Sequence, residues 1–88
     1  MEKDFPTEND RRADIACKLW QVGIDPEQLS SRLLDDIYKL PACHIGTLTG
    51  TFLWLRHEEF GDQELDKGQL NCCVLAALVH AKKMSQII

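Results

Sequence analysis

Apolar residues recur with a helical period in two stretches of the N-terminal half of the chain. The stripe of the first stretch consists of Ala13, Ala16, Cys17 and Trp20, and that of the second of Leu29, Leu33, Ile37 and Leu40. Such spacing is typical of amphipathic helices, whose apolar stripe faces a core while the other face meets water. We therefore predict helices over residues 9–22 and 26–40.

The segment 23–26 carries signals that end one helix and begin the next. Gly23 can adopt the left-handed conformation that closes a helix, and Ile24 is placed to contact the end of the first helix, as in a Schellman motif. Asp25 offers a carboxylate as N-cap, and Pro26 suits the first helical position, where its missing N–H costs nothing. The sequence thus predicts a capped turn between two neighbouring helices.

Residues 44–60 combine strand-forming and helix-forming features. Three threonines and two glycines lower the helix propensity of this stretch. The apolar residues nevertheless follow a helical period, at Ile45, Leu48, Phe52 and Leu55. We predict a helix over 44–60, ended by Gly61. Within it, Gly46 and Gly50 suggest a ridge where another helix approaches closely, with a ligand groove as the alternative.

A fourth helix is predicted over residues 67–84. Asp66 stands at the N-cap position and Gln69 three residues later, which is the pattern of a capping box. From Leu70 onward, apolar residues occupy all sides of the helix until Lys82. Such a pattern is typical of a helix that is covered all round.

Together these segments predict an all-α fold, a compact bundle of about four helices in a single domain spanning 1–88, with residues 1–7 as a flexible N-terminus. In so small a bundle, three helices have difficulty covering a fourth completely. Either the last helix is central, or a second chain buries part of its surface, including Ile87 and Ile88. We favour the second alternative, because small domains often complete a lean core by association.

Charge and composition weigh against several partners. The net charge is -4 and no segment is basic, which disfavours nucleic acid and an anionic membrane surface. The longest apolar run, Cys72 to Val79, is far shorter than the roughly 20 residues of a membrane-spanning helix, and the first residues do not form an apolar leader. We expect a cytoplasmic protein whose four cysteines are reduced and buried.

Catalytic and metal-binding patterns are weak. Cys43 precedes His44 and Cys72 precedes Cys73, but neighbouring residues on a helix point about 100° apart and do not converge on a metal ion. A cysteine nucleophile, Cys43 or Cys72, would need His44, His57 or His80 within hydrogen-bond reach, which only tertiary contacts could provide. We therefore expect no metal, no cofactor and no enzymatic activity.

The favoured function is that of a non-enzymatic interaction protein, such as a small chaperone, adaptor or regulatory subunit. It would bury an apolar helix face against another protein or, as a homodimer, against its own copy. The predicted partner-binding residues are Trp54, Leu70, Val74 and Leu78.

A helix-turn-helix DNA-binding regulator is the alternative function. The second helix of the turn at 23–26 would present Gln28, Ser31 and Arg32 to a major groove. The same helix would carry four carboxylates toward the phosphates, at Asp25, Glu27, Asp35 and Asp36, so this function ranks second.

Overall fold

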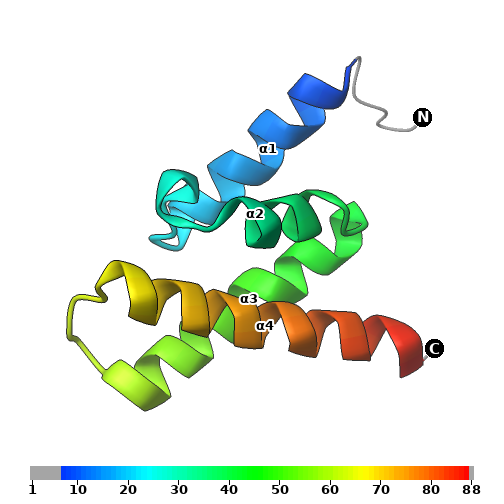
Figure 1. The fold of residues 1–88 in the computed structure, drawn as a ribbon. Helices are drawn as coiled ribbons and strands as arrows, with labels where there is room; N and C mark the ends of the chain where they lie inside the picture. Colours follow the sequence, from blue (N-terminus) through cyan, green and yellow to red (C-terminus); the bar gives the residue numbers. More distant parts are fainter. Residues whose placement is uncertain (1–6, 88) are drawn as a thin grey trace.

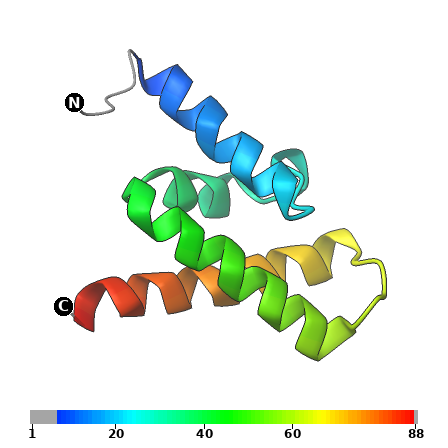
Figure 2. The same cartoon turned by 180° about the vertical axis from the view of Figure 1, so that it is seen from behind.

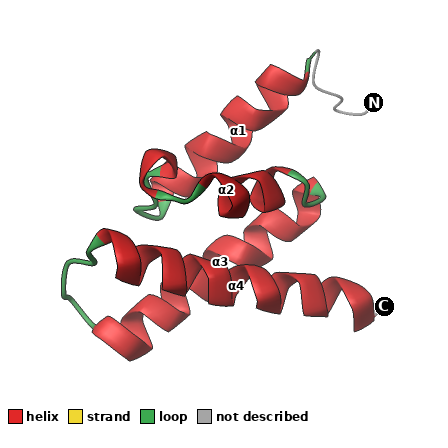
Figure 3. Ribbon diagram, viewed as in Figure 1, coloured by secondary structure: helices red, strands yellow, loops and turns green. Residues whose placement is uncertain are grey.

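The computed structural model describes residues 7–87, with side chains as far as Met84. The chain forms the helices α1 (Glu8–Gln21), α2 (Ser31–Tyr38), α3 (Ala42–Phe60) and α4 (Lys67–Ile87), with a short 3₁₀ turn, η1 (Pro26–Gln28), before α2. Within these described residues no strand occurs (Figure 3), so the all-α prediction is confirmed. Most of the predicted flexible N-terminus, residues 1–6, and the apolar end at Ile88 lie outside the described residues.

The two long helices, α3 and α4, cross each other and pack together along one side of the molecule (Figures 1 and 2). The short α2 packs against α4, and α1 packs against α3 and η1. In both views α2 lies between α1 and α4. Helix α4 is therefore not a central element with the other three wrapped around it, and one of its sides is left without a neighbouring helix.

A single apolar core joins all the helices. The described part of the chain buries no polar or charged residue. Phe52 is the largest side chain with almost no exposure. The other large core residues are Ile15 and Leu19 of α1, Ile24, Leu29, Leu33, Ile37 and Leu40 of the middle segment, Ile45 and Leu48 of α3, and Leu70, Val74 and Leu78 of α4.

The turn after α1 confirms the predicted Schellman motif. Gly23 has a φ of +86° and its N–H donates to the carbonyl of Trp20 at 3.0 Å. The N–H of Ile24 donates to the carbonyl of Leu19 at 2.9 Å, which is the second bond of the motif. Both Ile24 and Leu19 are completely buried, so the turn anchors α1 in the core.

The prediction of one continuous helix over 26–40 is wrong. Asp25 does cap the start, accepting from the N–H of Glu27 at 2.9 Å, but the turn that follows lasts only three residues. Leu29 and Ser30 then adopt extended backbone conformations, with ψ of 150° and 152°. The Ser30 hydroxyl accepts from the N–H of Leu33 at 3.3 Å and begins α2 anew. A second side-chain cap, five residues after the first, replaces the continuous helix.

The helical interpretation of 44–60 is confirmed, as is the predicted start of α4. Helix α3 begins at Ala42, slightly earlier than expected, and ends before Gly61, whose φ is +61°. Asp66 and Gln69 form the expected capping box: the Asp66 N–H donates to Oε1 of Gln69 at 3.0 Å, and the Gln69 N–H donates to Oδ1 of Asp66 at 2.8 Å. Helix α4 continues past the predicted end at 84 to Ile87.

The expected close approach of another helix at Gly46 and Gly50 does not occur. Both glycines are exposed, and a Cβ added to either would meet no atom within 4 Å. Helix α3 instead buries the opposite side, with Ile45, Leu48 and Phe52 in the core.

The Schellman turn gives a prediction with a matched control. Replacing Gly23 by alanine should lower the free energy of unfolding by about 1 kcal/mol, because a left-handed conformation is strained for a residue with a Cβ. Replacing Gly46 by alanine should instead raise the free energy of unfolding by about 0.5 kcal/mol, because Gly46 lies within α3 and an added Cβ would meet no atom within 4 Å. Urea denaturation of both variants measures the two changes, and equal effects would contradict this account.

Candidate functional site

Helix α4 has apolar residues on two opposite sides. Its inner row, which lies in the core, consists of Leu70, Cys73, Val74, Ala77, Leu78 and Ala81. Its outer row, which is exposed, consists of Cys72, Leu75, Ala76 and Val79. The outer residues follow the i, i+3, i+4, i+7 spacing of one helix face. We call these four residues the outer stripe.

The outer stripe presents large apolar side chains to water. Leu75 is 51% exposed and Val79 is 48% exposed. Among residues 7–87, Figure 1 shows α4 in front of α3 with no further helix in front of α4, so the side of α4 that faces away from α3 is uncovered. An exposed helix of a small globular domain normally carries polar residues on its outer face, so a second apolar row is unusual.

The predicted partner-binding residues divide between core and surface. Trp54 is 61% exposed on α3. Leu70, Val74 and Leu78 instead belong to the inner row, and a partner could contact them only if the core opened. A helix that is apolar all round does not reveal from its own sequence which side faces inward. One signal was present: Lys83, one turn after Val79, continues the line of the outer stripe and marks that side as solvent-facing.

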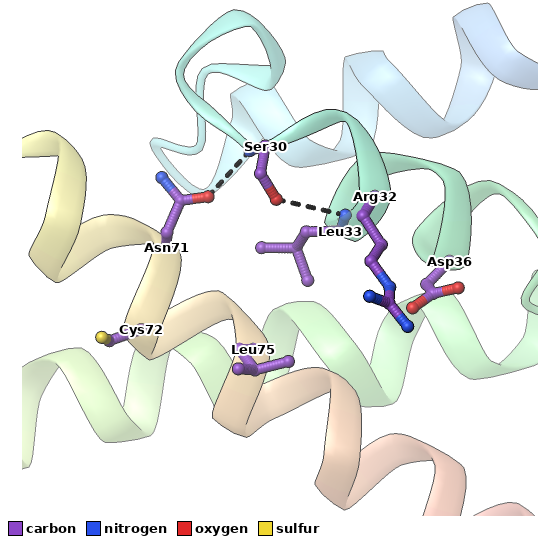
Figure 4. Close-up of a pocket in the computed structure, with 7 residues that line it drawn as sticks. All are labelled: Ser30, Arg32, Leu33, Asp36, Asn71, Cys72 and Leu75. Carbon is purple, nitrogen blue, oxygen red and sulfur yellow. Dashed lines mark hydrogen bonds between the residues drawn. The ribbon is translucent and has the colours of Figure 1, made fainter.

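A hollow of about 470 Å³ lies on one side of the outer stripe, between α2 and α4 (Figure 4). Leu33 extends into it from α2 and Leu75 from α4, and Cys72 lies at its edge. The remaining lining residues are Ser30, Arg32, Asp36 and Asn71. We call it the α2–α4 hollow.

Asn71 fixes the geometry of the α2–α4 hollow. Its Oδ1 accepts from the N–H of Ser30 at 2.8 Å, as Figure 4 shows. Its Nδ2 donates to the carbonyls of Gln28 at 2.9 Å and Lys67 at 2.8 Å. One side chain of α4 thus satisfies the backbone groups at the break between η1 and α2, and holds this segment beside the outer stripe.

A second hollow, of about 440 Å³, lies on the other side of the outer stripe, between α3 and α4. Its lining residues are Gly50, Thr51, Trp54, Leu55, Ala76 and His80. A smaller one of about 250 Å³ adjoins it and shares Leu55 and Ala76. The outer stripe is therefore a ridge between two depressions, which is the surface shape that a second helix packs against, ridges into grooves.

Opposite charges gather at the two ends of α4. The segment that leads into the helix, residues 62–66, contains Asp62, Glu64 and Asp66 and no basic residue. The last part of the helix contains Lys82 and Lys83 and no acidic residue. Nζ of Lys82 lies 3.9 Å from Oδ2 of Asp36 on α2, an exposed ion pair that contributes little stability. The carboxylate of Asp66 just before α4 suits the helix dipole, whereas Lys82 and Lys83 lie before the last turn of the helix, which ends at Ile87.

The cysteines do not lie as expected, because only Cys73 is buried and Cys17, Cys43 and Cys72 are exposed. All four are free. The Cys73 thiol faces the carbonyl of Phe52 at 3.9 Å, and burial raises its pKa, so it stays protonated and serves as a core residue.

The structure brings one cysteine near a histidine. Sγ of Cys43 lies 3.8 Å from Nδ1 of the adjacent His44, on the exposed first turn of α3. Among the described residues, no three His, Cys, Asp or Glu side chains gather in a way that could hold a metal ion.

The segment that the helix-turn-helix interpretation takes as its recognition helix is not a single helix. The break at Leu29 and Ser30 places Gln28 in η1, whereas Ser31 and Arg32 belong to α2. No single helix therefore presents these three side chains together.

Over the described residues, every helix is too short or too polar to span a membrane. Comparisons of the chain with protein-family models, with curated proteins and with solved structures found no match.

The two sides of α4 should respond very differently to the same substitution. Asp at Leu75 and Asp at Val79 should each lower the free energy of unfolding by about 1 kcal/mol, because each position already exposes about half of its side chain to water. Asp at Val74, which is fully buried, should cost at least about 3 kcal/mol by placing a carboxylate in the core. Chemical denaturation of dilute protein measures both, and strong unfolding of the double variant would contradict the assignment of inner and outer sides.

Proposed function

We propose that this chain is a non-enzymatic interaction module that binds an apolar helix, of another protein or of its own copy, along the outer stripe of α4. The observation that carries the proposal is the second apolar row of α4, opposite the core and open to water. Leu75 and Val79 are each about half exposed there. Removing such side chains from water on binding would contribute roughly 1 kcal/mol each.

The shape of the surface supports a helix as the bound element. The outer stripe rises between the α2–α4 hollow and the hollow between α3 and α4. Side chains at the i, i+3 and i+4 positions of a bound helix fit depressions of this kind. Trp54 stands at the rim of the second hollow, 61% exposed, and offers a large apolar contact at the edge.

The chemistry of the surface supports binding rather than catalysis. The outer stripe consists of three apolar side chains and one thiol, and its flanks supply exposed charged groups instead of a paired acid and base. A small chaperone, adaptor or regulatory subunit uses a surface of this kind. Three exposed free thiols suit a reducing compartment, and we place the proposed function in the cytoplasm.

Capture from the native host's lysate tests the proposal. The immobilised wild-type chain should retain protein, either further copies of itself or another chain, and the Leu75→Asp/Val79→Asp variant should lose it. The matched control is Leu53→Asp on α3, the same substitution at a leucine of nearly equal exposure (48% against 51%) that lines neither hollow.

The control chain should capture as much as the wild type. Circular dichroism should show the same helix content for all three chains, so that loss of capture reports the surface and not the fold. Equal capture by the wild type and the double variant would refute the proposed function.

A further inference from the structure

We infer that the occupant of the outer stripe is a second copy of this chain, with the two α4 helices packed antiparallel about a twofold axis between Leu75 and Ala76. This inference rests on the proposed function, since it names the partner. Three features of α4 carry it: the charges at its ends, the order of large and small residues along the outer stripe, and the hollows on both sides.

The charges favour a second copy in the antiparallel direction. Three carboxylates lie in 62–66. With Lys67, the first residue of α4, the segment 62–67 still has two more carboxylates than basic residues, whereas 81–87 has two lysines and no acidic residue. An antiparallel pair brings the acidic end of each α4 beside the basic end of the other, and the symmetry makes this match twice. A parallel pair would set like charges side by side and align the two helix dipoles unfavourably.

The outer stripe is complementary to itself in the same direction. About an axis between Leu75 and Ala76, Leu75 of each copy lies opposite Ala76 of the other. In the same register, Val79 lies opposite Cys72. A large residue thus always meets a smaller one, which lets the helices approach closely without a clash.

The same register also places Lys83 near carboxylates of the second copy. Lys83 continues the outer stripe one turn beyond Val79, and it falls opposite Gly68 of the second copy. Gly68 has no side chain to block the approach, and it follows two carboxylates, Glu64 and Asp66, and one lysine, Lys67. Asp66 lies two residues before Gly68, or about 3 Å along the axis, and the flexible stem of Lys83 can also extend toward Glu64 in the segment that leads into α4.

The hollows on both sides of the outer stripe offer room for side chains of the second copy that lie beside the stripe. The α2–α4 hollow borders Cys72 and Leu75, the positions that meet Val79 and Ala76 of the second copy. The hollow between α3 and α4 borders Ala76 and His80. A pair built mainly on two helices buries a small interface, so we expect a dissociation constant in the micromolar range.

Sedimentation equilibrium of the full chain over a range of concentrations is the first test. The wild type should approach twice the mass of one chain as its concentration rises. Leu75→Asp/Val79→Asp should remain at the mass of one chain, and the control Leu53→Asp should associate like the wild type. A wild type that stays monomeric, or a dimer abolished by Leu53→Asp and kept by the double variant, would overturn the inference.

A charge exchange tests the direction of pairing. Lys83→Glu should weaken the dimer about 5-fold, because a symmetric pair loses two exposed ion pairs that are each worth little. Adding Glu64→Lys to that variant exchanges the two charges and should restore most of the lost affinity. Failure of the double exchange to restore any affinity would count against the antiparallel arrangement.

Disulfide trapping tests the register independently. In a chain carrying Cys17→Ser and Cys43→Ser, mild oxidation should leave Cys72 unlinked, because two copies of Cys72 lie about seven residues apart along the paired helices, or about 10 Å. Adding Val79→Cys should give a covalent dimer whose peptides join positions 72 and 79. A link between the two copies of Cys72 in the parent chain would instead show parallel packing and overturn the inference.

The two proposals fail in different ways. A monomeric wild type that still captures a different protein through Leu75 and Val79 refutes the second copy as partner and leaves the interaction function standing. A chain whose mass and capture are both unaffected by the double variant refutes both.

Discussion

The packing of α3 against α4 is the constraint on which the rest of the structure depends. Phe52 of α3 and Val74 and Ala77 of α4 have almost no exposure. Small residues at Ala77 and Ala81 on the inner row let the helices lie close, and the Cys73 thiol faces the carbonyl of Phe52. Because these two long helices cover each other on one side only, the shorter elements must supply the remaining cover. They do not reach the outer side of α4, and the outer stripe is the consequence.

Asn71 shows how one polar side chain can organise a neighbouring segment. It lies on the flank of α4 between the inner row and the outer stripe, and it bonds to backbone groups of Gln28 and Ser30. The segment from η1 to α2 can leave the helical conformation there because its freed N–H and carbonyl groups find partners. The break turns Leu29 and Leu33 into the core and sets α2 beside α4. The two long-range hydrogen bonds of Asn71 therefore help to set the shape of the α2–α4 hollow.

The sequence predicts that α4 has an exposed apolar surface, but not which residues form it. The sequence shows that α4 carries more apolar residues than a small bundle can cover, and the exposed Leu75 and Val79 agree with that conclusion. It does not show which apolar row turns inward, because both rows follow the same helical period. The sequence pattern predicts Leu70, Val74 and Leu78 as contact residues, but in the structure they lie in the core. Only the position of α3 separates the two rows.

Local sequence is enough to specify one end of α1, of α3 and of α4. Gly23 and the capping box of Asp66 and Gln69 work through bonds that join residues at most five positions apart, so local sequence is enough to specify them. Long-range contacts set the break at Leu29 and Ser30 and select the side of α4 that faces the core. Both depend on groups that are distant in the chain, the amide of Asn71 in one case and the apolar face of α3 in the other. These contacts stabilise the fold only when segments distant in the chain come together, so a local sequence pattern does not predict them.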